Sequence, residues 1–151
     1  MTVQECLSIT DEMKPNMMSR MLKVKYITEI EQLIHREIVM KHYPEGFVPP
    51  QERHDPDTDP LGVWPAPWPP RPQPQPAPAY SESSDPGTVL VIPDPYSMVY
   101  VYWLMTKIDM QNQEDARYNI DRAHFENAYD TMSDWYTREH MPVQRHREFH
   151  L

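Results

Sequence analysis

The chain has 151 residues, a formal net charge of −9 and a single cysteine, Cys6. Its length fits one small domain. The negative charge argues against a general nucleic-acid coat or a membrane-surface protein, because both need clustered lysine and arginine. One cysteine excludes an intrachain disulfide and a cysteine-based metal site, so we expect Cys6 to pack as a small apolar residue. The longest apolar run, residues 98–105, is too short to cross a bilayer.

Two helices are predicted in residues 1–43. Thr2 and Glu5 have the spacing of a capping box for a helix over residues 2–13. Lys14 and Pro15 end that helix, and Asn16 is expected to cap the next one, over residues 17–42. This second helix carries apolar residues at spacings of three, four and seven, namely Met18, Leu22, Tyr26, Ile30, Leu33, Ile34 and Ile38. Its other side is expected to face solvent with Glu29, Glu31, Arg36 and Glu37.

The composition changes in residues 44–87, where thirteen prolines precede Tyr80. Each proline removes a backbone donor, so neither helix nor central strand is expected there. Where prolines are densest, in residues 64–80, polyproline II is the predicted conformation. The segment is interpreted as an extended arm inserted within one fold, anchored to a neighbouring subunit or partner by Trp64, Trp68 and Tyr80. A PxxP pattern with Arg71 leaves open a ligand for an SH3-like domain.

Residues 88–141 are predicted to form a short extended segment and a helical hairpin. The run TVLVI, residues 88–92, fits either a strand or an extended connection. Asp94 and Pro95 are expected to start a helix over residues 96–110 that is apolar on nearly all sides, which is typical of a helix buried in a core or an assembly. A strand is the alternative for that run. A turn over residues 111–113 leads to the last helix, residues 114–140.

Aromatic residues mark both helices of the predicted hairpin. At helical spacing such residues favour core or subunit interface over a base-binding or cofactor-binding face. Ala116, Ala123 and Ala128 are expected to allow another helix to approach closely. The candidate residues for helix packing or a ring interface are Tyr100, Trp103, Tyr118, Phe125, Tyr129 and Trp135.

No pattern matches a catalytic, cofactor or metal site, so we expect a protein that is not an enzyme and holds no cofactor. His35 and His42 lack the second ligand at four-residue spacing that a helical metal motif requires. The carboxylates of residues 109–126 are expected to form a solvated helix face that alternates with Arg117 and Arg122; they are Asp109, Glu114, Asp115, Asp121 and Glu126.

Two blocks of sequence resemble the head–tail connector, or adaptor, proteins of tailed bacteriophages. The first contains MTVQECLSITDEMKPN and KYITEIEQLIHREIV. The second is IPDPYSMVYVYWLMTKIDMQNQEDARYNIDRAHFENAYDTMSDWYTREHMP. Together they cover residues 1–43 and 93–141 and leave out the proline-rich arm. Family members often carry glycine where this chain has Gln113.

The resemblance implies a mainly α-helical subunit. From the residues we expect a single domain, 1–151, that is a small helical bundle with N-terminal helices (1–43), an inserted arm (44–87), a short extended segment and helical hairpin (88–141) and a C-terminal tail (142–151). The resemblance also implies a virion structural protein of the neck, assembled in the host bacterial cytoplasm. Subunits would form a ring, commonly of twelve, that binds the portal protein and the next neck or tail protein. DNA would pass through the ring without sequence-specific binding, aided by the acidic charge. The implied portal-docking residues in the tail are Arg145, Arg147, Phe149 and Leu151.

Two other functions stay open from the residues alone. One is a helical interaction module whose proline-rich segment binds a partner domain. The other is a helical DNA-binding regulator, which the net charge of −9 disfavours.

Overall fold

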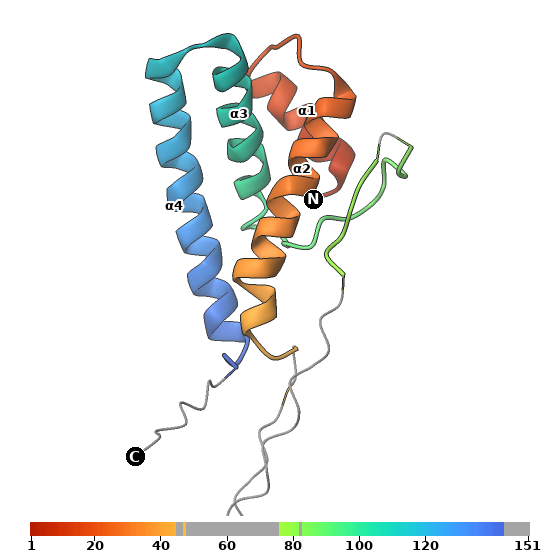
Figure 1. Cartoon of the computed structure of the whole chain (residues 1–151), viewed down its shortest axis with the longest axis vertical. Helices are drawn as coiled ribbons and strands as arrows, with labels where there is room; N and C mark the ends of the chain where they lie inside the picture. The colour runs from red at the N-terminus through yellow and green to blue at the C-terminus, as the bar shows by residue number, and fades with distance from the viewer. Residues whose placement is uncertain (45–46, 48–75, 82, 144–151) are drawn as a thin grey trace, which may run out of the picture.

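The computed structural model describes residues 1–44, 47, 76–81 and 83–143 (Figure 1). These residues form four α-helices and contain no β-strand, which confirms the mainly helical prediction. In Figure 1 the last two helices run antiparallel and side by side. The long second helix packs against the third helix, on the side away from the fourth. The elements are α1 (Val3–Met13), α2 (Arg20–Glu37), the short 3-10 helix η1 (Val39–Lys41), α3 (Met98–Asn112) and α4 (Asp115–Glu139).

The first two helices begin at polar caps. The predicted capping box is confirmed: the Glu5 amide donates to Thr2 Oγ1 at 3.2 Å, and the Thr2 amide donates to Glu5 Oε2 at 2.7 Å. The prediction that Asn16 caps α2 is wrong. Asn16 Oδ1 accepts from the Met18 amide at 3.0 Å, which forms a local turn. Ser19 is the cap instead, with its Oγ accepting from the Leu22 amide, so α2 starts three residues later than expected.

The third helix, α3, lies at the centre of the bundle. It contacts α1, α2 and α4, and eight of its residues are buried. The predicted all-round burial is therefore confirmed, and the strand alternative for this run is wrong. The burial of these eight residues comes from the chain's own helices, whereas residues 110–112 at the end of α3 stay exposed. The buried residues are Val99, Tyr100, Val101, Leu104, Met105, Thr106, Ile108 and Asp109.

The start of α3 differs from the prediction. Asp94 does not cap the helix; its carboxylate accepts from the N-terminal amino group at 3.1 Å and from the Ser97 hydroxyl. Helix α3 consequently begins at Met98, two residues later than expected. The Asp94 contact ties the start of the chain to the start of its central helix.

Residues 88–92 form an extended connection that pairs with the N-terminus. The Val3 amide donates to the Thr88 carbonyl at 2.9 Å, and the Leu90 amide donates to the Met1 carbonyl at 3.1 Å. Pairing stops there because α1 begins at Val3, so only one isolated bridge forms. Alternate side chains of the connection point into the core, with Leu90 buried and Val89 exposed.

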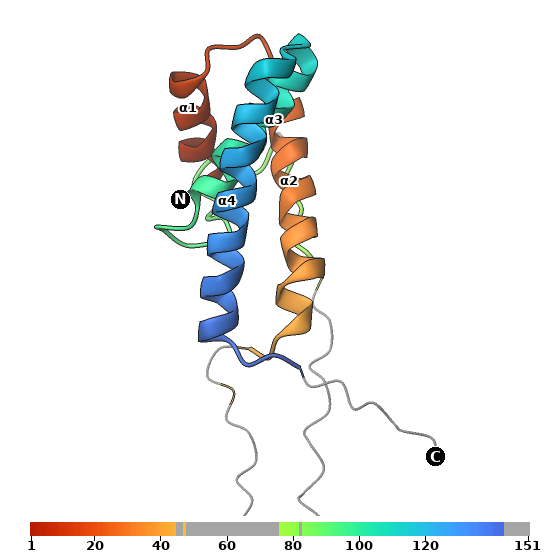
Figure 2. The same cartoon turned by 90° about the vertical axis from the view of Figure 1, so that its left-hand side faces the viewer.

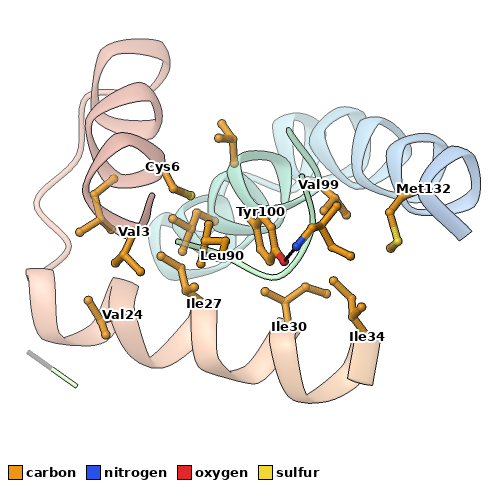
Figure 3. Packing of buried hydrophobic residues seen from close by; sticks show 14 of the residues in the cluster. Val3, Cys6, Val24, Ile27, Ile30, Ile34, Leu90, Val99, Tyr100 and Met132 are labelled. Atoms are coloured by element: carbon orange, nitrogen blue, oxygen red, sulfur yellow. Dashed lines mark hydrogen bonds between the residues drawn. The ribbon is translucent and has the colours of Figure 1, made fainter. Parts of the chain in front are cut away.

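One hydrophobic core joins these elements (Figure 3). Tyr100 of α3 lies at its centre, between Ile27 and Ile30 of α2 and the extended residue Leu90. Cys6 is fully buried in the same cluster, as expected for a small apolar residue, and burial raises the pKa of its thiol to about 12. Met132 brings α4 into this core. Most other residues of α4 stay at least partly exposed, including Ala116 and Ala123, which contradicts their expected role in close helix approach.

The turn between α3 and α4 depends on one residue in the left-handed region. Gln113 has φ 58°, and its amide donates to the Met110 carbonyl at 3.3 Å. The Glu114 amide donates to the Asp109 carbonyl at 3.1 Å, so the two bonds close the end of α3. A side chain at this φ costs conformational energy that glycine avoids.

We predict that Gln113→Gly stabilises the protein by about 0.5–1 kcal/mol, because glycine relieves the left-handed backbone at the helix end. Chemical denaturation measures the change. The matched control is Gln111→Gly, two residues earlier inside α3, which should destabilise by about 1 kcal/mol. Equal effects of the two substitutions would show that the turn is not strained at Gln113.

Candidate interaction surface

The described residues that flank the proline-rich segment and the C-terminal tail pair with each other at one end of the bundle, which we call the base. It consists of η1, His42, Tyr43 and residues 140–143. The Tyr43 amide donates to the Met141 carbonyl and the Val143 amide donates to the Lys41 carbonyl, both at 2.8 Å. His42 and Pro142 form the accompanying antiparallel bridge. Figure 2 shows the last turns of α2 and α4 together at this end. The base therefore fixes where two extended segments start.

Aromatic and histidine rings pack together at the base. Tyr136 stacks on His140 with ring centroids 3.8 Å apart, and His42 meets the Tyr136 ring edge-on at 5.4 Å. The Nδ1 atoms of both histidines lie within hydrogen-bond distance of backbone carbonyls one turn earlier, at 2.8 Å for His42 and 3.1 Å for His140. These contacts hold the rings in place. Within the described residues, no three metal-ligating side chains come together.

The proline-rich segment returns to the bundle at Tyr80. The Tyr80 amide donates to Thr28 Oγ1 on α2 at 3.0 Å, and its hydroxyl donates to Glu31 Oε1 at 3.1 Å. Burial and the nearby Glu31 carboxylate raise the pKa of the Tyr80 hydroxyl, which keeps it a proton donor. In the described residues the polar groups of Tyr80 bond to α2 of its own chain, and its predicted contact with a neighbouring subunit or partner stays a prediction.

Glu31 is the hub of this region. Its Oε1 accepts from the Val91 amide at 3.0 Å and from the Tyr100 hydroxyl at 2.9 Å, in addition to the Tyr80 hydroxyl. The residue is only 1 % exposed, which contradicts its predicted position on the solvent side of α2. Burial raises the pKa of the Glu31 carboxyl, although the three donors and His35 oppose the shift.

A signal for this burial was present in the sequence. Glu31 follows Ile27 by four residues and precedes Ile34 by three, so it occupies the same helix face as two core residues. The donors that satisfy it come from residues 49 to 69 positions away, which local spacing cannot reveal.

A second buried charge cluster joins α1, α3 and α4. The Lys14 ammonium contacts Asp109 and Asp121, and Asp109 is fully buried. Both aspartates were predicted to lie on a solvated face, and both predictions are wrong. Burial and the neighbouring Asp121 raise the pKa of the Asp109 carboxyl, against the effect of Lys14. Arg117 pairs with Glu114 at 2.9 Å on the exposed side of α4.

The aromatic candidates turn out to have several roles. Tyr100 is entirely buried, so it packs helices and cannot lie at a ring interface. Trp103, Phe125 and Tyr129 form a half-buried cluster between α3 and α4, with centroid distances of 5.0 and 5.7 Å. Trp135 stacks on Tyr96 at 4.7 Å.

The remaining member of that set is Tyr118, which is half-buried near the start of α4. Its hydroxyl accepts from Arg122 Nη1 at 3.2 Å. Together with the half-exposed Trp103 cluster, it keeps part of the predicted aromatic surface accessible to solvent.

Several predicted site residues lie outside the described residues. They are Trp64, Trp68, Arg145, Arg147, Phe149 and Leu151. The described part of the chain has a shallow depression beside the N-terminus, lined by Met1, Gln4, Glu5, Ser8, Ile9 and Asp94. Its polar groups take part in caps and turns, so the depression offers no catalytic constellation.

Comparisons with known proteins give no assignment. No protein-family model, curated protein or solved structure matches the chain. None of the helices in the described ranges is long and apolar enough to cross a membrane.

We predict that Glu31→Ala lowers the free energy of unfolding by about 3 kcal/mol, because three buried donors lose their acceptor and a cavity remains. Glu31→Gln keeps an acceptor oxygen and should stay within about 1 kcal/mol of wild type at pH 7. Since the folded-state pKa of Glu31 is raised, its stabilising contribution is complete below the unfolded pKa and falls as pH rises through the folded value. Denaturation from pH 4 to 8 should therefore show wild type losing stability relative to Glu31→Gln.

The matched control is Glu29, two residues earlier on α2 with a side chain 50 % exposed. Glu29→Gln should change stability by less than about 0.5 kcal/mol at every pH, as surface ion pairs contribute little. Equal effects of Glu29→Ala and Glu31→Ala would contradict the buried hub.

Proposed function

We propose that this protein is a virion structural protein, a head–tail connector whose subunits form a ring beneath the portal. The ring, commonly of twelve subunits in the family that the sequence resembles, extends the DNA channel and docks the next neck or tail protein. The protein works by assembly and has no enzymatic step or cofactor. It acts in the neck of the virion after assembly in the bacterial cytoplasm.

The observation that carries the proposal is the geometry of the base. The outgoing proline-rich segment and the tail follow two antiparallel backbone stretches that are hydrogen-bonded to each other, residues 41–43 and 141–143. The returning segment is fixed higher on α2 by Tyr80. A compact bundle that presents two long segments from one end suits a subunit that clasps other proteins, because extended segments contact much surface per residue.

The charge and the fold support different parts of the proposal. A net charge of −9 suits a channel wall that DNA slides past without binding. The buried helix α3 gives no support, because its own chain covers it. The case for a ring therefore rests on the sequence resemblance and on the proline-rich segment and C-terminal tail, which in this proposal contact other subunits.

In this proposal the tail residues bind the portal. Arg145 and Arg147 supply charge, and Phe149 and Leu151 supply apolar anchors. Pro142, at the start of the tail, forms an antiparallel bridge with His42. The side chain of His42 is held in turn by its edge-on contact with Tyr136. A rigid starting point reduces the entropy lost when such a segment docks.

We predict that the purified protein, mixed with the portal protein encoded by the same genome, forms ring complexes visible by electron microscopy. The double substitution Arg145→Ala with Arg147→Ala should weaken portal binding roughly tenfold or more, as for buried arginine anchors. The matched control is Arg122→Ala with Arg138→Ala, on the exposed face of α4. The control should bind as wild type.

A chain that stays monomeric with portal present, and that mass spectrometry does not find in virus particles, would contradict the connector proposal. Capture of the proline-rich segment by an SH3-like domain, with no portal binding, would favour the interaction-module alternative instead.

A further inference from the structure

The end of the bundle opposite the base exposes large apolar side chains from all four helices or their connections. We call this surface the apolar end. It combines the last turns of α1 and α3, residues 14–19, and the first turns of α2 and α4, which Figures 1 and 2 show together at one end. Its side chains and exposed fractions are Met13 (48 %), Met17 (100 %), Met21 (62 %), Met110 (57 %) and Ile120 (59 %).

None of these five side chains belongs to the hydrophobic core cluster or to the partly buried residues packed against it. The core beneath is closed by other residues, including the Lys14 cluster with Asp109 and Asp121. Large exposed apolar surfaces on a small protein commonly mark contact sites. Methionine suits such a site, because its flexible thioether adapts to a partner and makes favourable contacts with aromatic rings.

We propose that the apolar end receives Trp64 and Trp68 from the proline-rich arm of a second copy of this chain. The inference deepens the proposed connector function by naming the surface that one subunit offers to the arm of another. The arm supplies the matching chemistry, two tryptophans within five residues flanked by prolines. Prolines limit the freedom that the segment loses on binding.

The length of the arm and its fixed ends favour a second copy over the same chain. The arm departs near Phe47 at the base and is fixed again from Pro76, four residues before Tyr80. Trp68 precedes Pro76 by eight residues, a reach of about 25 Å at the polyproline II rise, and is the more constrained of the two tryptophans, since Trp64 has about 12 Å more.

Reaching the apolar end of its own bundle would use this whole length. Thr28, which holds Tyr80, lies seven residues of α2 below Met21, or about 10 Å. The four residues from Tyr80 back to Pro76 run toward the base (Figure 1) and add about 12 Å. The chain from Pro76 to Trp68 would therefore have to run straight along the bundle. Almost none of its about 25 Å would be left to turn sideways to Met17 or Met110. A copy positioned beyond the base can be reached without this constraint.

Such a contact joins different surfaces of two copies, the arm of one and the apolar end of the next. Contacts of this kind are heterologous and propagate into closed rings or open filaments. A ring of subunits linked by their arms is the closed form.

The test measures self-association of the full chain by analytical ultracentrifugation. Trp64→Ala with Trp68→Ala disables the arm, and Met17→Ser with Met110→Ser disables the apolar end. Each variant alone should self-associate roughly tenfold or more weakly than wild type, as expected for the loss of central anchors. A mixture of the two should form a heterodimer that grows no further, because only one arm and one apolar end in each pair are intact.

The matched control is Val89→Ser, which removes an apolar side chain that is 67 % exposed on the extended connection away from the apolar end. It should associate as wild type. All substituted apolar side chains in the described residues are exposed, and circular dichroism should show unchanged helix content.

A photo-crosslinker at position 64, in a mixture of isotope-labelled and unlabelled chains, identifies the partner. Crosslinks between labelled and unlabelled chains at the apolar end support the proposal; crosslinks only within one chain overturn it. Wild type that remains monomeric, or variants that assemble as wild type, also overturn it. Portal binding by a protein whose assembly ignores these substitutions would leave the connector function standing, whereas arm-dependent assembly without portal binding would remove the connector function alone.

Discussion

A single buried carboxylate organises this fold. Glu31 accepts hydrogen bonds from the Val91 amide and the hydroxyls of Tyr80 and Tyr100 through one oxygen. These donors lie on three parts of the chain: the extended connection, the returning arm and the central helix. An unsatisfied carboxylate at this depth would be costly, so the three segments must come together for α2 to bury this face. The arm's return is thereby part of the folded domain.

The sequence predicts the parts of the fold that depend on local spacing. The capping box at Thr2, the all-round burial of α3 and the helical hairpin all follow from neighbours within one or two turns. Asn16 and Asp94 were assigned as caps from residue type, but nearby partners drew both into other bonds. Glu31, Asp109 and Asp121 were placed in solvent, because the groups that satisfy them are distant in sequence and appear only in the packed bundle.

The candidate surfaces also divide into features that local sequence predicts and features that only distant contacts create. Proline density predicts an extended arm, but it does not predict that Tyr80 returns to its own α2. The apolar end cannot be predicted from any one helix, because Met13, Met17 and Met110 belong to three separate parts of the chain. Each residue alone is an ordinary exposed methionine. Only the fold brings them to the end opposite the base, which gives the described bundle two unlike ends.

The central claim is that Tyr80 and residues 88–92 are an integral part of the bundle, held by Glu31. Native-state hydrogen exchange tests it at the amides of Tyr80, Val91 and Ile92, whose acceptors are Thr28, Glu31 and Tyr100. The account predicts that the Val91 and Ile92 amides exchange only through openings nearly as costly as global unfolding, like amides in α3. It predicts measurable protection at Tyr80 as well. Exchange of these amides at the rate of an unfolded peptide, with α3 still protected, would contradict it.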